Sequence, residues 1–592
     1  MAATWGPSWL RPGLTSALSR AARIFLAVGR LLEQTGFDGL TTRYQYDANT
    51  GRLASTHVGQ RRIDMTFDPV GRLTSRVASQ GEQREEETFA YDGNGKLIQA
   101  INAASKLQWF HDEAGNLTRE HQHYLATGTP MVAVWQHEYD ALNLRTSTVR
   151  PDGHKVSWLT YGSGHLLGMR LDAHELLAYE RDDLHREVAR HQGNQLLQTQ
   201  KWDPLGRLQE QWLGSGDGKS TLIKRGYQYD AIGQLLQIDD NRRGSLSYQY
   251  DPVGRLLSAT SRLGQETFAF DPASNLLAPK TADLPQRGLP RSRLLDNLLR
   301  EYADTHYQYD DRGNLAQRLR DSQRSHFTWD LFDRLVSYRD DRLQANYAYD
   351  ALGRRLYKQT EAHYQDRPED GSELNRLERL KRNRQFDCGV TLYGWDGDTL
   401  AWESRAADKA GEGERTTHYL YEPGSFVPVA QAVHKRFIPL IPEPEYGAFY
   451  QQENDPLWAD APKPKEIDAL AWYQCDHLGT PQELTDQAGE VVWSAQYKAW
   501  GGIKEERSSS ALQQGIANPL RFQGQYHDPE TGLHYNRYRY YDPEVGRFVS
   551  KDPIGYAGGL NLFQYANNPL TWIDPFGLAG RKTSKPRIEP GN

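Results

Sequence analysis

Hydrophobic and polar residues alternate along most of this chain in short segments that end at an aspartate. The segments "YQYDAIGQL", "YQYDPVGRL" and "FAFDPASNL" place Asp230, Asp251 and Asp271 at steps of 21 and 20 residues. Two aromatic residues that lie two positions apart point to the same face of a strand. The Asp, usually with a Gly three residues later, is typical of a turn. Each copy therefore predicts a strand, a turn and a second strand.

This unit recurs with a fixed period near twenty residues. A fixed period predicts an array of stacked repeats, because one hairpin cannot bury its hydrophobic face alone. The period is about half that of a propeller blade, so we expect an all-β chain with a continuous spiralling sheet. Further copies are centred on Asp47, Asp68, Asp92, Asp112, Asp140, Asp182, Asp203, Asp310, Asp330 and Asp350, and one degenerate copy has Gly162 in the Asp position.

Three segments depart from the repeat. Residues 1–39 carry apolar residues at helical spacing with arginines between them, which predicts a short amphipathic N-terminal helix rather than a cleaved signal peptide. Residues 361–387 are charged and contain "SELNRLERLKR", which predicts a helical or loose surface insertion. Residues 437–466 are rich in Pro and acidic residues and predict an extended segment.

Composition and charge narrow the set of partners. The chain carries 70 Lys and Arg against 77 Asp and Glu, a net charge of −7. This mild acidity argues against nucleic acid as the main partner, because nucleic-acid binding usually needs a basic face, so we expect no nucleic-acid partner. Its only cysteines, Cys388 and Cys475, form no disulfide framework. No apolar run reaches the roughly 18 residues of a membrane-spanning helix, so membrane contact is expected only through residues 1–35.

Two local motifs are similar to chemical sites but have the wrong spacing. The segment "GSGDGKS", residues 214–220, lacks the first Gly of a phosphate-binding loop, because the position five before Gly218 is Leu213. Cys475 and His477 lie two residues apart, but no second pair with zinc spacing accompanies them. We interpret both motifs as structural, and we expect no metal site and no cofactor.

A pair of Asp-Pro-x-Gly elements is the strongest candidate for chemistry. Asp552 opens the first element and Asp574 the second, eighteen residues separate the two elements, and Leu578 follows the second. A single such element is most often a tight turn, in which Pro fixes one backbone angle and Gly permits another. The turn residues of this pair are Pro553, Gly555, Pro575 and Gly577.

Three stretches resemble the Rhs family. The repeated "YxYDxxGRL" resembles its YD repeat, residues 472–486, "WYQCDHLGTPQELTD", resemble its Cys-Asp-His-Leu-Gly-Thr-Pro element, and residues 521–578 resemble its associated core. The resemblance covers roughly residues 40–578. It implies a hollow shell, in which the sheet coils around an enclosed chamber, and a core domain that closes one end and cuts the chain. The segment behind the cut, commonly a toxin in this family, is held inside.

On this resemblance the chain divides into six parts. They are an N-terminal segment (1–39), a YD-repeat array (40–360), a charged insertion (361–387), further repeats with the Pro-rich insertion 437–466 (388–500), an Rhs-associated core (501–578) and a short basic tail, or toxin stub (579–592).

The resemblance also implies self-cleavage. The family cuts after the Leu of this pattern, here Leu578, before Ala579. Two carboxylates can hydrolyse an amide when one is ionised and activates water while the other is protonated and donates its proton. We expect Asp552 and Asp574 to be that pair. Lys551 stands where many relatives have Arg; it keeps the positive charge but lacks the forked geometry of a guanidinium.

Three functions fit the sequence. The first is a toxin-delivery shell of an antibacterial or insecticidal effector, secreted without a signal peptide, as in type VI secretion. It would enclose its own C-terminal segment and cut itself at most once, with a secretion spike or a chaperone as a candidate partner. The second is a non-catalytic scaffold for cell-surface adhesion or partner binding, as in teneurins. The third is an inactive truncated remnant, because residues 579–592 are too few for a toxin domain. The core motif and the paired aspartates favour the first.

Overall fold

The computed structural model describes residues 22–25, 29–36, 39–277, 293–295, 297–368, 371–447, 450–578 and 580–582. The regular secondary structure of these residues is almost entirely antiparallel β-sheet, which confirms the predicted all-β class. The described residues contain two α-helices, α1 (Gly371–Gln385) and α2 (Ser509–Gln514). Neither is long and apolar enough to cross a membrane.

The first sheet has 24 strands in the described residues, and β1 to β22 each pair antiparallel with the next strand in the chain. The strands are β1 (Ala22–Phe25), β2 (Leu31–Thr35), β3 (Thr41–Tyr46), β4 (Leu53–Val58), β5 (Arg61–Phe67), β6 (Leu73–Gln80), β7 (Gln83–Tyr91), β8 (Leu97–Ile101), β9 (Ser105–His111), β10 (Leu117–Tyr124), β11 (Met131–Tyr139), β12 (Arg145–Val149), β13 (Lys155–Tyr161), β14 (His165–Leu171), β15 (His174–Arg181), β16 (Glu187–Gln192), β17 (Leu196–Trp202), β18 (Leu208–Ser215), β19 (Thr221–Tyr229), β20 (Leu235–Asp240), β21 (Gly244–Tyr250), β22 (Leu256–Ser261), β23 (Gly264–Thr267) and β36 (Ile441–Pro442), which joins at β11.

The second sheet has 16 strands in the same described ranges, again paired in chain order. They are β24 (Arg293–Leu295), β25 (Leu298–Tyr302), β26 (Thr305–Tyr309), β27 (Leu315–Arg320), β28 (Gln323–Trp329), β29 (Leu335–Arg339), β30 (Leu343–Tyr349), β31 (Arg355–Ala362), β32 (Val390–Asp396), β33 (Thr399–Arg405), β34 (Arg415–Tyr421), β35 (Pro428–His434), β37 (Ala469–Cys475), β38 (Pro481–Asp486), β39 (Val491–Tyr497) and β40 (Ile503–Arg507).

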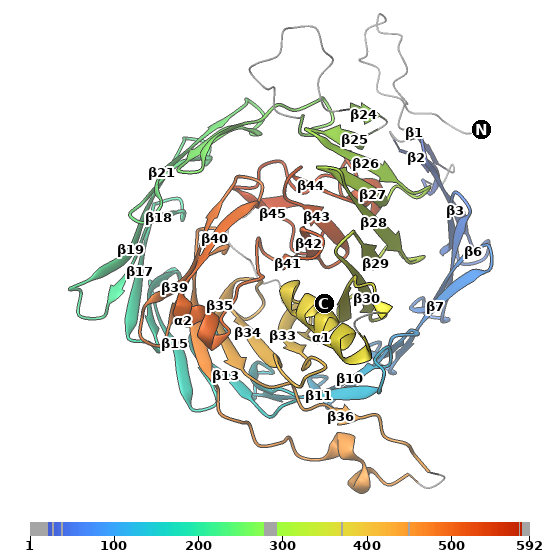
Figure 1. The fold of residues 1–592 in the computed structure, drawn as a ribbon, viewed down its shortest axis with the longest axis horizontal. Helices are drawn as coiled ribbons and strands as arrows, with labels where there is room; N and C mark the ends of the chain where they lie inside the picture. Colours follow the sequence, from blue (N-terminus) through green and yellow to red (C-terminus); the bar gives the residue numbers. More distant parts are fainter. Residues whose placement is uncertain are drawn as a thin grey trace, which may run out of the picture.

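The two sheets form successive turns of one spiral (Figure 1). The first sheet is the outer turn and the second sheet is the inner turn, which lies inside it. The predicted ladder is interrupted between β23 and β24, where the described residues contain only an isolated bridge between Phe270 and Leu276. The largest hydrophobic cluster joins the turns, since it contains Tyr124 and Trp135 of the outer turn and Trp402 of the inner turn.

The aspartate of each repeat forms the predicted turn. In the copy at Asp251, the backbone N–H groups of Val253 and Arg255 donate to Oδ1, at 3.0 and 2.8 Å. Gly254 has a φ of +87°, which a residue with a side chain adopts at a cost. The guanidinium Nε of Arg255 donates to Oδ2 at 2.6 Å, so the Arg four positions after the Asp locks the turn from the side.

The C-terminal residues form a small unit inside the spiral. A four-stranded sheet contains β41 (Tyr526–Asp528), β42 (Leu533–Asn536), β43 (Arg539–Asp542) and β44 (Arg547–Phe548), and β45 (Trp572–Ile573) pairs with β46 (Arg581–Lys582). Figure 1 places β41 to β45 within the inner turn. A buried ion pair of 2.6 Å between Arg355 and Asp528 joins the small sheet to β31.

The helix predicted for residues 1–39 is wrong in its described part. Ala22–Phe25 and Leu31–Thr35 form strands β1 and β2, because β2 pairs with β3 and so extends the outer sheet by two strands. Residues 1–21 lie outside the described residues. The hydrogen bonds of sheet extension therefore outweigh the helical spacing of the apolar residues in this segment.

The two insertions have different structures. Helix α1 lies within the charged segment 361–387. The Pro-rich segment 437–466 contributes strand β36 to the edge of β11 and then packs on the outer turn. There, the ring of Trp458 meets Phe110 at 4.9 Å in an edge-to-face contact.

Candidate active site

The structure brings Asp552 and Asp574 together around one guanidinium. Asp552 follows β44, and Asp574 follows β45 directly. Both aspartates are buried: Asp552 is 8% exposed and Asp574 is 1% exposed. Arg539 of β43, also 1% exposed, places Nη2 3.0 Å from Oδ2 of Asp552 and 3.4 Å from Oδ2 of Asp574. Two carboxylates and one cation thus share a buried site.

Both aspartates also form the tight turns that their sequence predicts. The N–H of Ile554 donates to Oδ1 of Asp552 at 3.0 Å, and the N–H of Gly555 donates to its backbone carbonyl at 2.9 Å. In the second turn, the N–H of Leu578 donates to Oδ1 of Asp574 at 2.9 Å. The turn and the paired site are therefore compatible, because each turn uses Oδ1 and leaves Oδ2 to face Arg539.

The carbonyl group of Leu578 belongs to the same site. Nη2 of Arg539 donates to the Leu578 oxygen at 3.2 Å, and Nε of Arg539 donates to the carbonyl of the preceding residue, Gly577. A Cβ atom added at Gly558 would stand 2.6 Å from the Leu578 oxygen and would overlap with Oδ2 of Asp552. The bond predicted to be cut therefore begins between a guanidinium and a carboxyl group. Ala579, on the far side of that bond, lies outside the described residues.

Burial changes the acidity of the first aspartate. It raises the pKa of Asp552 to about 6, against opposing effects of Arg539 and of the N–H of Ile554, and Asp574 raises it further. Burial also lowers the pKa of Arg539, although both aspartates oppose this effect. A carboxyl group with a pKa near 6 exchanges its proton near neutral pH, as a general acid must.

The remaining predicted residues lie around this pair. The Lys551 side chain lies against Gly313 in the turn between β26 and β27, with Cε 2.6 Å from the position of an added Cβ. Pro553 is exposed, whereas Pro575 is buried and its carbonyl fills the space beside Gly524.

Three contributors to the site are not apparent from the sequence: Arg539, Gly558 and Asn536. Asn536 donates Nδ2 to the backbone carbonyl of Asp574 at 2.9 Å. Strand alternation places Arg539 and Tyr541 on one face of β43, but it does not tell which face meets the aspartates. Gly558 has φ −79° and ψ −13°, an ordinary helical conformation, so only the crowding around it requires Gly.

The motif around Cys475 and His477 has a structural environment. The Cys475 Sγ lies 3.5 Å from the carbonyl of Pro428, and the His477 Nε2 lies 3.0 Å from the carbonyl of Leu570. Burial raises the pKa of the Cys475 thiol, which disfavours the reactive thiolate. These contacts agree with the structural interpretation of this motif.

Two family profiles match this chain. The profile described as Teneurin YD-shell matches residues 15–211 and 182–367, which together exceed half of the chain, and the profile described as RHS protein matches residues 470–507.

Two bacterial toxins are similar in sequence. The chain is 33% identical to the double-stranded DNA deaminase toxin A of Burkholderia cenocepacia over an alignment of 599 residues. This alignment covers 94% of this chain and 37% of the toxin. The chain is 36% identical to the toxin protein Tse5 of Pseudomonas aeruginosa over an alignment of 554 residues. This second alignment covers 86% of this chain and 39% of Tse5. The chain thus spans less than half the length of each toxin.

Solved structures share the fold. The Tc holotoxin pore of Photorhabdus luminescens aligns with a TM-score of 0.72 at 17% identity, over 95% of this chain and 28% of that chain. A crystal structure of TcdB2-TccC3 without its hypervariable C-terminal region aligns with a TM-score of 0.66 at 17% identity, over 93% of this chain and 28% of that one. Both likenesses extend over nearly the whole spiral.

Proposed function

Because the chain belongs to the family described as Teneurin YD-shell and is similar in sequence to two bacterial toxins, we propose that it is the shell part of a delivered toxin and that it cuts itself once, after Leu578. The observation that carries this proposal is the meeting of Asp552, Asp574 and Arg539 at the Leu578 carbonyl in one buried site. A plain turn would need none of these contacts.

The geometry supports a division of labour between the two carboxylates. Oδ1 of Asp574 accepts the N–H of Leu578 and so orients the carbonyl group of Leu578 toward Arg539. The guanidinium then stabilises the negative charge that develops on that oxygen when water attacks the carbonyl carbon. Asp574, ionised, takes a proton from the water. Asp552, the carboxyl with the raised pKa, gives its proton to the leaving nitrogen of Ala579.

The products are a carboxyl group at Leu578 and an amino group at Ala579. The substrate is the protein's own chain, so each molecule turns over once. The segment behind the cut stays paired, because β46 forms a two-residue ladder with β45, in which Ile573 pairs with Arg581 and Trp572 with Lys582. We propose that this ladder and the position of β45 within the inner turn retain the C-terminal segment as enclosed cargo.

The toxin relatives support a delivered, extracellular role for the whole protein, with its own C-terminal segment as the first partner. A type VI-like secretion apparatus or a chaperone is the further partner that we propose for export. No observation favours adhesion or an inactive remnant over this function.

Mass spectrometry of the freshly purified chain tests the cut. Under denaturing conditions we expect a main species that ends at Leu578 and a peptide of residues 579–592. Under native conditions we expect the two to remain together, which is the result that enclosure requires. A full-length mass that persists on prolonged incubation near pH 6 would rule out self-cleavage, and a free peptide under native conditions would rule out retention.

A further inference from the structure

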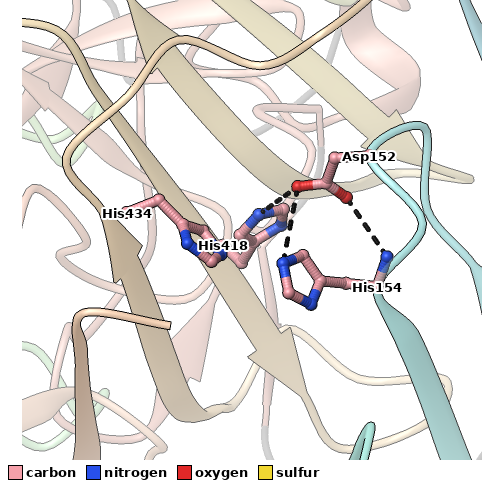
Figure 2. Close-up of side chains that lie close together, drawn as sticks. All are labelled: Asp152, His154, His418 and His434. Carbon is pink, nitrogen blue, oxygen red and sulfur yellow. Dashed lines mark hydrogen bonds and ion pairs between the residues drawn. The ribbon is translucent and has the colours of Figure 1, made fainter. Parts of the chain in front are cut away.

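Four metal-ligating side chains meet where the outer turn contacts the inner turn (Figure 2). Asp152 and His154 lie between β12 and β13 of the outer turn, His418 lies in β34, and His434 ends β35. All four residues are buried, with exposed fractions of 8%, 2%, 1% and 3%. One ligand atom from each side chain lies within 4.8 Å of the ligand atoms of the other three.

Two of the histidines are oriented by their outer nitrogen. Nδ1 of His154 lies 2.6 Å from Oδ2 of Asp172, and Nδ1 of His434 lies 3.0 Å from the carbonyl oxygen of Glu466. Because both partners are acceptors, each ring carries its proton on Nδ1, and its Nε2 lone pair faces the cluster. Metal-binding histidines typically show this arrangement, with the second nitrogen bonded to a carboxylate or a backbone carbonyl.

Two of the three inner nitrogens, Nε2 of His418 and Nε2 of His434, lack the hydrogen bonds that their burial would require. Nε2 of His434 has no hydrogen-bond partner among the described residues. Nε2 of His418 lies 2.9 Å from Oδ2 of Asp152, yet the two atoms lack hydrogen-bond geometry. Nε2 of His154 lies 4.0 Å from the same oxygen. A buried polar atom without a partner costs about 1–3 kcal/mol, so a cation that binds all of these atoms would remove a real penalty.

We propose that Asp152, His154, His418 and His434 bind one Zn²⁺ ion, which joins the outer turn of the spiral to the inner turn. Three imidazoles and a carboxylate are a donor set that Zn²⁺ accepts, and four protein ligands with no open position are typical of a structural zinc site. The site lies apart from the aspartate pair, so this inference is independent of the proposed self-cleavage.

Binding requires small movements. In a tetrahedral zinc site with bonds of about 2.0–2.1 Å, the ligand atoms lie about 3.4 Å apart, so the widest separation must close. The rings of His154 and His434 are 27° from parallel, and they must tilt for both lone pairs to point at one ion. The ring of His418 must move its proton to Nδ1. Arg150, which donates to that atom at 2.9 Å, then keeps its bonds to the carbonyls of Ala401 and Tyr419.

The site was invisible in the sequence because its ligands come from distant segments. Asp152 and His154 have a short spacing, but His418 and His434 follow far along the chain and only the coiling of the two turns brings them near.

Metal analysis of the wild-type full chain is the first test. We expect one zinc ion per chain after purification, loss of that ion on treatment with a chelator, and recovery on addition of Zn²⁺ with a rise in melting temperature. Co²⁺ in place of Zn²⁺ should give the visible absorption of tetrahedral cobalt. If the chelator-treated wild type binds no Zn²⁺ in equilibrium dialysis, the proposal is wrong.

Variants locate the ion. His434→Gln should abolish zinc binding. Asp172→Asn, which changes the carboxylate that orients His154 and also accepts the N–H of Lys155, should weaken it about 10- to 100-fold. His191→Gln is the matched control, since His191 is a half-exposed histidine paired with Glu180 on the outer turn. Equal zinc content in wild type and His434→Gln would identify an adventitious ion only and would overturn the proposal. If His434→Gln does not fold, the wild-type measurements and Asp172→Asn decide.

Discussion

Asp251 and Asp552 open the same Asp-Pro-x-Gly turn in two regions of the molecule, and their environments differ most at Oδ2. Each accepts at Oδ1 the N–H of the residue two positions later, at 3.0 Å in both turns. In the repeat, Oδ2 is held by Arg255 of the same turn at 2.6 Å. In the core, Oδ2 faces Arg539, which comes from another strand and also contacts Asp574.

The two carboxyl groups have pKa values that are shifted in opposite directions from the usual value. Burial raises the pKa of Asp251, but the backbone N–H and the guanidinium of Arg255 outweigh it, so that its pKa lies below the usual value. At Asp552 burial prevails and raises the pKa to about 6. The motif therefore specifies the turn, whereas the second carboxylate oxygen and its surroundings specify whether chemistry can follow. A sequence pattern of four residues contains only the first of these.

Replacing the aspartates should give the largest difference between the two regions. Asp552→Asn or Asp574→Asn should slow release of residues 579–592 at least about 100-fold, because each removes one of the two proton-transfer groups. Asp251→Asn, in the same motif, should leave the rate unchanged. Intact mass against time measures all three. Cleavage of either core variant at the wild-type rate would break the comparison.

Crowding at the core turn should have the next largest effect. Gly558→Ala should slow the cut about 100-fold, because its methyl group would displace the Asp552 carboxyl or the Leu578 carbonyl, and misplacement by about 1 Å costs that much. Gly93→Ala is the control: it lies in a repeat turn, also without a positive φ, and an added Cβ meets nothing within 4 Å. A Gly558→Ala protein that cuts as fast as Gly93→Ala would place the reacting carbonyl elsewhere.

The features that could be predicted from the sequence are those whose contacts join residues close together in the chain. The repeat turns were predictable, because the Asp, the Gly and the Arg that locks the turn lie within four residues, and the period of the pattern sets the fold. The aspartate pair was implied by the resemblance to the Rhs family, through two local motifs that eighteen residues separate. Arg539 was not, because its contacts with Asp552 and Asp574 depend on how β43 packs inside the inner turn.

Two other features depended on tertiary structure alone. The N-terminal segment carries apolar residues at helical spacing, and only the pairing of β2 with β3 makes Leu31–Thr35 a strand. The ligand cluster of Asp152 and His418 needs the two turns of the spiral to pass each other. In this protein, local and periodic contacts can be predicted from the sequence, whereas contacts between the outer and inner turns of the spiral cannot.

The pH dependence of the cut should give a smaller, graded difference. If Asp552 donates the proton, the active form is abundant below its pKa of about 6, and the rate should fall about tenfold for each unit of pH above that value. Chain refolded from denaturant at several pH values, with fragment release followed by mass, measures this. Tryptophan fluorescence at each pH controls for folding. A constant rate between pH 6 and 8 would show that Asp552 is not the proton donor.

Stability should show the smallest difference, and its sign should be opposite in the two regions. The pKa of Asp251 is lowered on folding. Its contribution to the free energy of unfolding is therefore fully present above the pKa that Asp251 has in the unfolded chain, and it is lost as pH falls through the pKa of the folded state. Asp251→Asn should therefore destabilise at pH 7, by only about 0.5–1 kcal/mol, because Arg255 is one quarter exposed and solvent screens the pair.

The pKa of Asp552 is raised on folding, so the folded chain binds more protons than the unfolded chain between about pH 4 and 6 and loses stability as pH rises through that range. Asp552→Asn should remove that loss, worth about 1–3 kcal/mol, although it also removes the contact with Arg539. Urea midpoints at pH 5 and 7, with all chains in an Asp574→Asn background to keep them whole, measure the slope that Asp552 contributes. The Asp251→Asn chain should keep this slope and the Asp552→Asn chain should lose it. Parallel slopes for the Asp552→Asn and Asp251→Asn chains would mean that the two carboxyl groups share one environment, and the contrast between repeat and core would then have no electrostatic basis.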